Sequence, residues 1–285
     1  MVADVLSKYI CFGLLWLLAG CVLLSDRHEQ AETIAASGDL YEDDIETGLF
    51  RLKTFHKGLE SRPERLTVYI EGDGFAWRRK GVLSSDPTPK NPVALRLASR
   101  DPRTAVLYIA RPCQFLDPQE LKDCPPGYWS SHRYANEVIA SVNKVIDLGM
   151  KNSGASMVDL IGYSGGGSIA ALVAARRPDV NSLVTVAANL DLGAWTRLHD
   201  VSPLAGSLNA ADIAEKIQHI PQYHFVGARD DIVPGPVTES YLGRISDPSQ
   251  VVIKRIPGFD HACCWVDSWP ELLCDAGAID RSYCK

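Results

Sequence analysis

The residues from Asp159 to Pro178, DLIGYSGGGSIAALVAARRP, carry the strongest structural signal in this chain. An apolar run ends at a single serine, Ser164, which has glycines close by on both sides, and an alanine-rich helical pattern follows at once. Glycines permit a very tight turn between a strand and a helix. Such a turn either carries the serine by chance or exposes its hydroxyl group as a nucleophile. Residues elsewhere in the chain are needed to distinguish these two interpretations.

Apolar runs like the one before Ser164 recur along the chain, each bounded by turn-forming residues. They cover residues 66–72, 105–111, 157–164, 182–188, 222–228 and 251–258. Their almost continuous Val, Ile, Leu and Tyr content is typical of strands buried on both faces, as in a parallel sheet. Helical patterns lie between them, at 135–148, 168–177, 211–217 and 237–245. This alternation predicts a doubly wound, mostly parallel α/β sheet with helices on both faces, in a single domain over residues 46–285.

Residues 162–166, Gly-Tyr-Ser-Gly-Gly, match the pattern G-x-S-x-G. In a nucleophile elbow this pattern places the serine on a strained turn between a strand and a helix. The predicted strand before Ser164 and the predicted helix after it supply that context. A phosphate-binding P-loop is disfavoured, because no Lys-Ser or Lys-Thr pair follows the glycines. We therefore interpret Ser164 as a nucleophile, which needs a base to take its proton and an acid to orient that base.

Three more stretches follow predicted strands and carry polar residues of the required kinds. Gly-Ala-Arg-Asp-Asp-Ile-Val-Pro occupies 227–234, Pro-Gly-Phe-Asp-His occupies 257–261, and Glu-Gly-Asp-Gly-Phe occupies 71–75. Together with G-x-S-x-G, these stretches resemble the motifs of the α/β-hydrolase family, in the family's order along the chain. The resemblance extends from about Phe50 to the end, and the family's fold is the sheet predicted above.

The resemblance assigns a Ser-His-Asp triad. Residues 227–234 resemble the family's G-x-x-D-x-x-V-P acid turn, which selects Asp230 as the acid. Asp231 beside it stays open, and so does Asp191, a position after the preceding strand that some lipases use. His261 follows the last predicted strand, the place of the family's catalytic base, and Ser164 is the nucleophile.

The resemblance also implies an oxyanion hole of two backbone N–H groups. One N–H group belongs to Gly165, the residue after the nucleophile. The other belongs to the loop after an early strand, where the family often has His-Gly-x-Gly and this chain has Glu71 in place of the histidine. Asp73 is favoured by position and Gly74 is the alternative. A carboxylate so close to an oxyanion helps only if its side chain points away.

The reaction implied by these parts is acyl transfer to water through an acyl-enzyme, with no metal or organic cofactor. A carboxylesterase or lipase-like enzyme acting on a small-molecule or lipid ester is favoured, because no charged specificity pocket can be identified. Aromatic residues in the loops are candidates either for an acyl pocket or for core packing: Phe75, Trp77, Phe115, Tyr128, Trp129 and Trp195. A peptidase, an acyltransferase and a non-catalytic envelope lipoprotein that keeps the fold for binding are the alternatives.

The N-terminal residues have the pattern of an export signal. Lys8 precedes a short apolar stretch over residues 9–18, too short to span a bilayer comfortably. Leu-Ala-Gly-Cys at 18–21 resembles the bacterial lipobox, which makes residues 1–21 a lipoprotein signal peptide and Cys21 the lipidated residue; an ordinary secretory signal is the alternative. Val22 after the cysteine favours anchoring to the outer membrane, facing the periplasm. The polar, acidic residues 22–45 are expected to form a tether.

Six further cysteines fit an exported, disulfide-bonded domain: Cys113, Cys124, Cys263, Cys264, Cys274 and Cys284. Cys113 and Cys124 are near neighbours and are expected to pair, and the other four to pair among themselves. A bond between Cys263 and Cys264 is disfavoured, because adjacent residues would strain the intervening peptide. A metal site that combines His261 with these cysteines is the alternative, but the paired C-x-x-C spacing of such sites is missing.

The amino-acid composition indicates how large a core the chain can form and which binding partners to expect. The chain has 285 residues, of which 46% are hydrophobic, and a formal net charge of −6. This is enough for one sizeable core. The acidic balance, and the lack of a long Lys/Arg-rich run, exclude nucleic acid as an expected partner.

Overall fold

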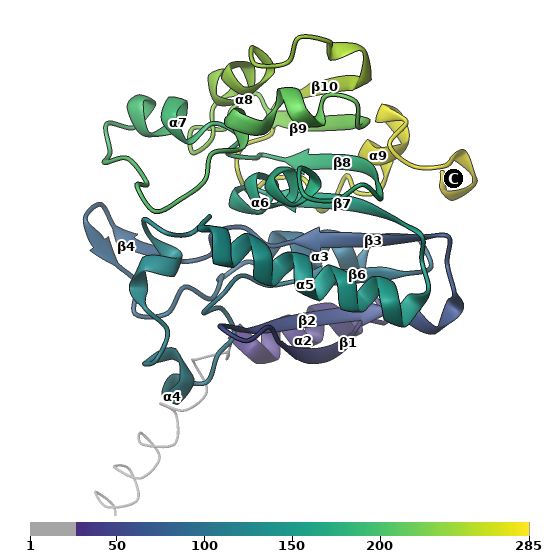
Figure 1. The fold of residues 1–285 in the computed structure, drawn as a ribbon, viewed down its shortest axis with the longest axis horizontal. Helices are drawn as coiled ribbons and strands as arrows, with labels where there is room; N and C mark the ends of the chain where they lie inside the picture. The colour runs from purple at the N-terminus through teal and green to yellow at the C-terminus, as the bar shows by residue number, and fades with distance from the viewer. Residues whose placement is uncertain (1–26, 285) are drawn as a thin grey trace, which may run out of the picture.

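The computed structural model describes residues 27–284 and contains one large sheet between two layers of helices (Figure 1). The proposed signal peptide and Cys21 lie outside the described residues. The strands are β1 (Tyr41–Glu46), β2 (Arg51–Lys57), β3 (Arg65–Ile70), β4 (Trp77–Arg79), β5 (Val82–Leu83), β6 (Val106–Ile109), β7 (Met157–Tyr163), β8 (Val180–Val186), β9 (Gln222–Gly227) and β10 (Val251–Ile256). The α-helices are α2 (Arg27–Ala36), α3 (Val93–Ser99), α4 (Pro118–Leu121), α5 (Asn136–Ser153), α6 (Gly165–Ala174), α7 (Leu192–Leu198), α8 (Gly235–Leu242) and α9 (Glu271–Ala276).

The large sheet has eight strands in the order β1-β2-β6-β3-β7-β8-β9-β10. The six strands from β6 to β10 are parallel, whereas β1 and β2 extend the β6 edge in antiparallel pairing. The parallel strands correspond to the six apolar runs of the sequence, and the predicted fold class is confirmed. Because all parallel strands end at the same edge, the loops after β3, β7, β9 and β10 meet there.

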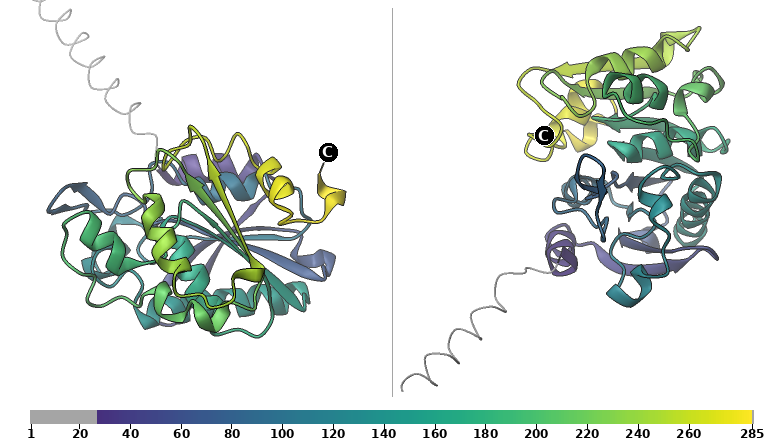
Figure 2. Two further views of the ribbon diagram at one scale, coloured as in Figure 1. Left: turned by 90° about the horizontal axis from the view of Figure 1, so that it is seen from above. Right: turned by 90° about the vertical axis from the view of Figure 1, so that its left-hand side faces the viewer.

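Both faces of the sheet are covered, as the views in Figure 2 show. One core packs α5 and α6 against the sheet, around Val138, Val142 and Ile169. The opposite core packs α2, α3 and the C-terminal segment, around Leu95, Trp265 and Trp269. Burial on both faces explains the largely apolar sequences of β3, β6, β7 and β8, whereas the edge strand β10 is partly exposed and contains Lys254 and Arg255. None of the helices between residues 27 and 284 is long and apolar enough to cross a bilayer.

The expectation of a polar tether over residues 22–45 is wrong for residues 27–45. These residues form α2, which packs against α3, and most of the edge strand β1. Only Ala31 and Ala35, one helical turn apart, are buried in α2. β1 is mostly exposed and is held by backbone pairing to β2 and by ion pairs of Glu42 and Asp44 with Lys53. Small buried residues and a polar edge strand leave almost no apolar pattern in the sequence.

Two of the three disulfides among the described residues agree with the expected pairing. Cys113 bonds to Cys124, and Cys274 bonds to Cys284. The expectation against a bond between Cys263 and Cys264 is wrong, because these adjacent residues form a disulfide. Their peptide bond is cis, with the two Cα atoms 3.1 Å apart.

Two neighbouring alanines test whether α2 belongs to the domain. We expect Ala35→Asp to lower the free energy of unfolding by about 3 kcal/mol, because it buries a carboxylate without a partner. Ala36→Asp adds the same charge at an exposed position of the same helical turn and is expected to change stability by less than about 0.5 kcal/mol. Urea unfolding of both variants measures the difference. Equal stabilities would mean that α2 is not packed on the domain.

Candidate active site

Ser164 lies on the turn between β7 and α6 in a backbone conformation that L-residues rarely adopt. Its φ is 51° and its ψ is −121°. The turn is possible because Gly162 and Gly166 lie in contact: a Cβ atom added to Gly162 would overlap the backbone of Gly166. The predicted strand–serine–helix turn is therefore present, with the serine side chain at the carboxyl edge of the sheet.

A continuous chain of hydrogen bonds joins Ser164, His261 and Asp230. The Nε2 atom of His261 lies 3.0 Å from Ser164 Oγ, and its Nδ1 atom lies 2.9 Å from Asp230 Oδ2. The other carboxylate oxygen of Asp230 accepts the backbone N–H groups of Ile232 (2.9 Å) and Val233 (2.8 Å). An accepting carboxylate requires the hydrogen on Nδ1, which leaves Nε2 free to accept the serine proton.

Two contacts fix the backbone that carries His261. The Tyr163 hydroxyl group donates to the His261 carbonyl oxygen at 2.9 Å, and the Trp265 indole donates to the same oxygen at 3.1 Å. His261 is thus tied to β7, the strand that ends directly before Ser164. The Trp265 side chain is fully buried, so this contact also connects the loop to the core.

The two other candidate acids lie elsewhere. Asp231 is exposed and is not bonded to His261. Asp191 caps α7: it accepts the Ala194 backbone N–H group at 3.1 Å and the Ser240 hydroxyl group at 2.6 Å. Among the three aspartates left open by the sequence, only Asp230 contacts the imidazole.

The loop after β3 passes directly over the elbow. A Cβ atom added to Gly72 would lie 3.3 Å from the Cβ atom of Ser164, and one added to Gly165 would overlap the Asp73 carboxylate. Gly72 donates its N–H group to Glu71, and Phe75 donates its own to Pro87. The N–H groups of Asp73 and Gly74 have no hydrogen-bond acceptor within residues 27–284. Both oxyanion candidates are thus free to donate, and Gly165 begins α6, where the first N–H groups have no intrahelical partner.

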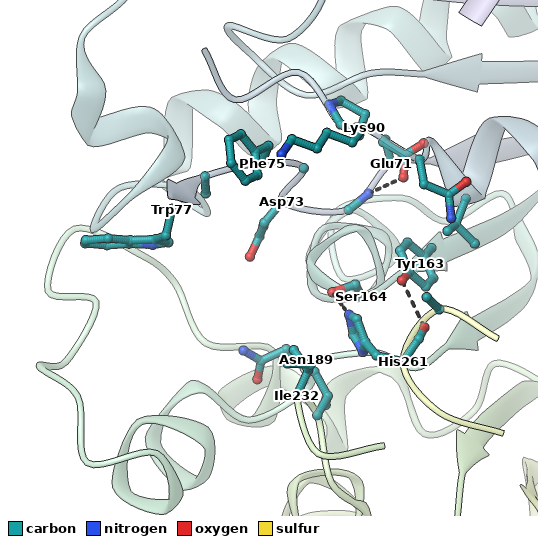
Figure 3. A pocket seen from close by; sticks show the side chains of 18 of the residues that line it. Glu71, Asp73, Phe75, Trp77, Lys90, Tyr163, Ser164, Asn189, Ile232 and His261 are labelled. Atoms are coloured by element: carbon teal, nitrogen blue, oxygen red, sulfur yellow. Dashed lines mark hydrogen bonds between the residues drawn. The ribbon is translucent and has the colours of Figure 1, made fainter. Parts of the chain in front are cut away.

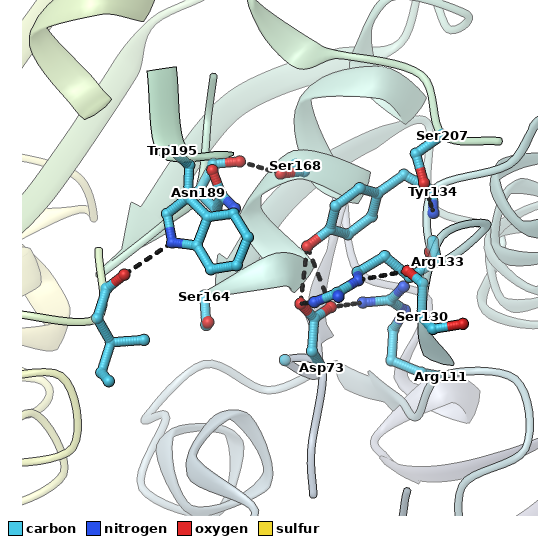
Figure 4. Close-up of polar contacts among 12 residues, drawn as sticks. Asp73, Arg111, Ser130, Arg133, Tyr134, Ser164, Ser168, Asn189, Trp195 and Ser207 are labelled. Atoms are coloured by element: carbon cyan, nitrogen blue, oxygen red, sulfur yellow. Dashed lines mark hydrogen bonds and ion pairs between the residues drawn. The ribbon is translucent and has the colours of Figure 1, made fainter. Parts of the chain in front are cut away.

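The Asp73 side chain lies between two arginines (Figure 4). Arg111 contacts one carboxylate oxygen at 2.9 Å, Arg133 contacts the other at 2.6 Å, and Tyr134 donates its hydroxyl group at 2.9 Å. Burial opposes ionisation, but the two guanidinium charges outweigh it and hold the pKa of Asp73 below its ordinary value. The negative charge beside Gly165 is therefore compensated. Sequence reasoning did not find this cluster, because its members lie 38 to 61 residues from Asp73.

Glu71 is buried beneath the same loop, at the position where the family often has histidine. Its carboxylate accepts the Gly72 N–H group at 2.9 Å and the Tyr108 hydroxyl group at 3.1 Å. It also accepts two longer bonds, both 3.4 Å, from the N–H groups of Ala94 and Leu95 in α3. Burial raises the pKa of Glu71 to about 7. This side chain ties the loop to α3 and to the neighbouring strand β6.

A pocket of about 520 Å³ opens above Ser164 and His261 (Figure 3). Three of the six aromatic candidates, Phe75, Trp77 and Trp195, line it. Phe115 and Trp129 are buried in two separate hydrophobic clusters, and Tyr128 packs against the cluster of Trp129.

Sequence reasoning missed the polar residues of the pocket wall, which include Lys90, Arg133 and Asn189. Oδ1 of Asn189 is buried and has no hydrogen-bond partner among residues 27–284. It is therefore available to a donor group on a bound molecule. No group of three or more His, Cys, Asp or Glu side chains that could hold a metal ion occurs in the described part of the chain.

No family model matches the sequence, and no curated protein sequence matches it. Solved structures do match. Est1E from Butyrivibrio proteoclasticus with bound ferulic acid gives a TM-score of 0.60 at 14% identity, covering 83% of this chain and 100% of that one. A bacterial membrane phospholipase A gives a TM-score of 0.52 at 17% identity, covering 95% of this chain and 100% of that one. An esterase from Pyrococcus furiosus gives a TM-score of 0.58 at 12% identity, covering 85% of this chain and 93% of that one. At these identities the likeness establishes the α/β-hydrolase fold.

The burial of Glu71 predicts a pH-dependent stability. Its folded pKa of about 7 lies above the unfolded value of 4.5, so the folded state holds the proton more tightly. The stability from this proton is complete below pH 4.5 and is lost as the pH rises through 7. Relative to Glu71→Gln, which cannot ionise, we expect the wild type to lose about 2 to 3 kcal/mol between about pH 5 and about pH 8 in urea unfolding. A difference that does not change with pH would show that Glu71 is not buried as described.

Proposed function

We propose that this chain is a serine hydrolase that cleaves an ester-like acyl bond through Ser164, His261 and Asp230. The observation that carries the proposal is the unbroken hydrogen-bond chain from Asp230 through His261 to Ser164 Oγ. It lies at the carboxyl edge of an α/β-hydrolase sheet, beneath an open pocket. The names of the similar structures, which include esterases and a phospholipase, support the same reaction class.

The mechanism follows from this arrangement. Ser164 Oγ attacks the carbonyl carbon of the ester while its proton moves to His261 Nε2, and Asp230 stabilises the imidazolium that forms. The N–H groups of Gly165 and Asp73 meet the oxyanion. The intermediate collapses, His261 gives the proton to the leaving alcohol, and an acyl-enzyme remains on Ser164. Water then attacks the acyl carbon while its proton moves to His261. The bond to Ser164 Oγ breaks, the acid leaves, and His261 returns the proton to Oγ.

The pocket favours carboxylic or lipid esters as substrates. Phe75, Trp77 and Trp195 are part of its wall, and their aromatic side chains suit an acyl chain or an aromatic acid. The cations Arg111 and Arg133 compensate the charge of Asp73 beside Gly165, so that the carboxylate does not oppose the developing oxyanion. The triad needs no metal or organic cofactor for this chemistry.

The cellular place of the reaction is part of the proposal. The lipobox-like residues 18–21 support export and lipid attachment at Cys21, and Val22 supports the outer membrane, with the enzyme facing the periplasm. The disulfides Cys113–Cys124 and Cys274–Cys284 fit an oxidising compartment. The enzyme would then meet esters in, or next to, the cell envelope.

Two neighbouring aspartates and the nucleophile test the mechanism. We expect Ser164→Ala to lower kcat on 4-nitrophenyl esters by roughly 10⁶, because no other group replaces the nucleophile. Asp230→Asn should lower it by roughly 10⁴ through the wrong imidazole tautomer. Asp231→Asn, the matched control, should leave kcat within about twofold.

Initial rates across a series of acyl chain lengths measure these effects and give the preferred acid. Hydrolysis by Ser164→Ala at a rate near that of the wild type would contradict the proposed nucleophile. Equal losses in the two aspartate variants would contradict the assignment of Asp230.

A further inference from the structure

A two-stranded hairpin, formed by β4 and β5, projects from one end of the domain (Figure 1). It is separate from the large sheet and lies in the connection between β3 and α3. Trp77 on β4 belongs to the pocket wall, with Phe75 just before the strand. The hairpin therefore borders the mouth of the pocket.

The hairpin carries a cluster of cations that have no acidic partners in the described part of the chain. Arg78, Arg79 and Lys80 are consecutive and exposed, and none of them forms an ion pair with another residue between 27 and 284. Lys90 lies close by, 3.9 Å from the centre of the Phe75 ring. The chain as a whole has a net charge of −6, so this concentration of positive charge is local.

Exposed apolar side chains lie on the hairpin, at Ile232 of the pocket wall and on α7. Trp77 is 40% exposed and Val82 is 37% exposed on the hairpin, and across the pocket Ile232 is 49% exposed. Leu198, at the end of α7, is 51% exposed. The Trp195 indole on α7 donates to the Ile232 carbonyl oxygen at 2.7 Å, which holds this second side of the mouth together. Solvent-exposed Trp, Val, Leu and Ile beside unpaired cations are typical of a surface that meets a membrane interface.

The described chain also begins on this side of the domain. Arg27 donates to the Thr88 carbonyl oxygen at 2.8 Å and to the Asp86 carboxylate at 3.1 Å, and its guanidinium group lies 5.4 Å from the Phe75 ring. Cys21 precedes Arg27 by six residues. Six residues span at most about 20 Å when fully extended. A lipid on Cys21 would therefore hold a bilayer close to the hairpin and the mouth.

We propose that the β4–β5 hairpin, together with the exposed side chains of Ile232 and Leu198, is a docking surface for an anionic phospholipid bilayer. Arg78, Arg79 and Lys80 attract the lipid phosphates, and Trp77 and Val82 enter the interface. The mouth of the pocket then faces the membrane, and an ester within the bilayer reaches Ser164 without crossing bulk water. Vesicle binding by this surface does not require the proposed chemistry, whereas the delivery of an ester to Ser164 and the position of the lipid on Cys21 rest on the proposed function.

Vesicle binding tests the docking surface independently of catalysis. Residues 27–284 contain the complete sheet and both cores, so a chain that begins at Val22 keeps every contact described above and lacks the lipid. Ser164→Ala is introduced throughout, so that no lipid is consumed. Sedimentation with phosphatidylcholine vesicles, with and without phosphatidylglycerol, gives the partition constant. We expect binding to the anionic vesicles that weakens as salt is added.

Two triple variants separate the hairpin from the general charge of the protein. Neutralising Arg78, Arg79 and Lys80 to Gln should weaken binding to anionic vesicles by about 100-fold, because each cation near an anionic surface contributes about fivefold. The control neutralises three exposed cations distant from the hairpin, Lys144, Lys151 and Arg281, and should change binding by less than about twofold. Trp77→Ala should weaken binding to both kinds of vesicle.

Several results would overturn the proposal. These are no binding by the folded chain, equal losses in the two triple variants, or full binding after the hairpin cations are neutralised. Another such result is normal vesicle binding by the hairpin variant together with a raised KM for a soluble anionic ester when Ser164 is present. The cations would then bind a negatively charged substrate and not a membrane. Vesicle binding without any esterase activity of the Ser164 chain would contradict the proposed function and leave the docking surface intact.

Discussion

The left-handed backbone of Ser164 is the constraint around which the site is arranged. Such a conformation costs on the order of 1–3 kcal/mol and persists only where the surroundings enforce it. Here β7 leads into α6 through glycines packed against one another, and the Ser164 N–H group is held by the Val186 carbonyl oxygen of β8 at 2.9 Å. Because neighbouring parallel strands end at the same edge, the loops that follow β3, β9 and β10 can meet at this one turn.

Buried charge is the second organising feature of the site. Asp73 and Glu71 lie in one short loop, yet they differ in their partners. Asp73 is ionised between Arg111 and Arg133, whereas Glu71 has only neutral donors and a raised pKa. The loop is thus anchored through both side chains, and the backbone N–H group of Asp73 has no acceptor among residues 27–284. The fold supplies the rigidity that an oxyanion hole requires, since donors aimed in advance need no reorganisation during the reaction.

The sequence was sufficient for the parts of the molecule that follow local rules. Continuous apolar runs predicted the six parallel strands, and G-x-S-x-G together with the positions of Asp230 and His261 predicted the chain of hydrogen bonds. Features that depend on contacts between distant residues were not predictable. The ion pairs of Asp73 join separate loops. The helix α2 has only two buried residues, Ala31 and Ala35. The short hairpin is exposed and has no alternation of apolar and polar residues. The bond between Cys263 and Cys264 contradicted the expectation that adjacent cysteines do not pair.

The account depends on whether Ser164 is chemically activated, and a fluorophosphonate probe tests this directly without knowledge of the substrate. The probe is applied to the folded chain that begins at Val22, and the labelled residue is identified by mass spectrometry. Labelling at Ser164 that disappears on heat denaturation and in Ser164→Ala is the result predicted by the hydrogen-bonded triad. Absence of labelling in well-folded protein, or labelling of a different serine, would contradict the account.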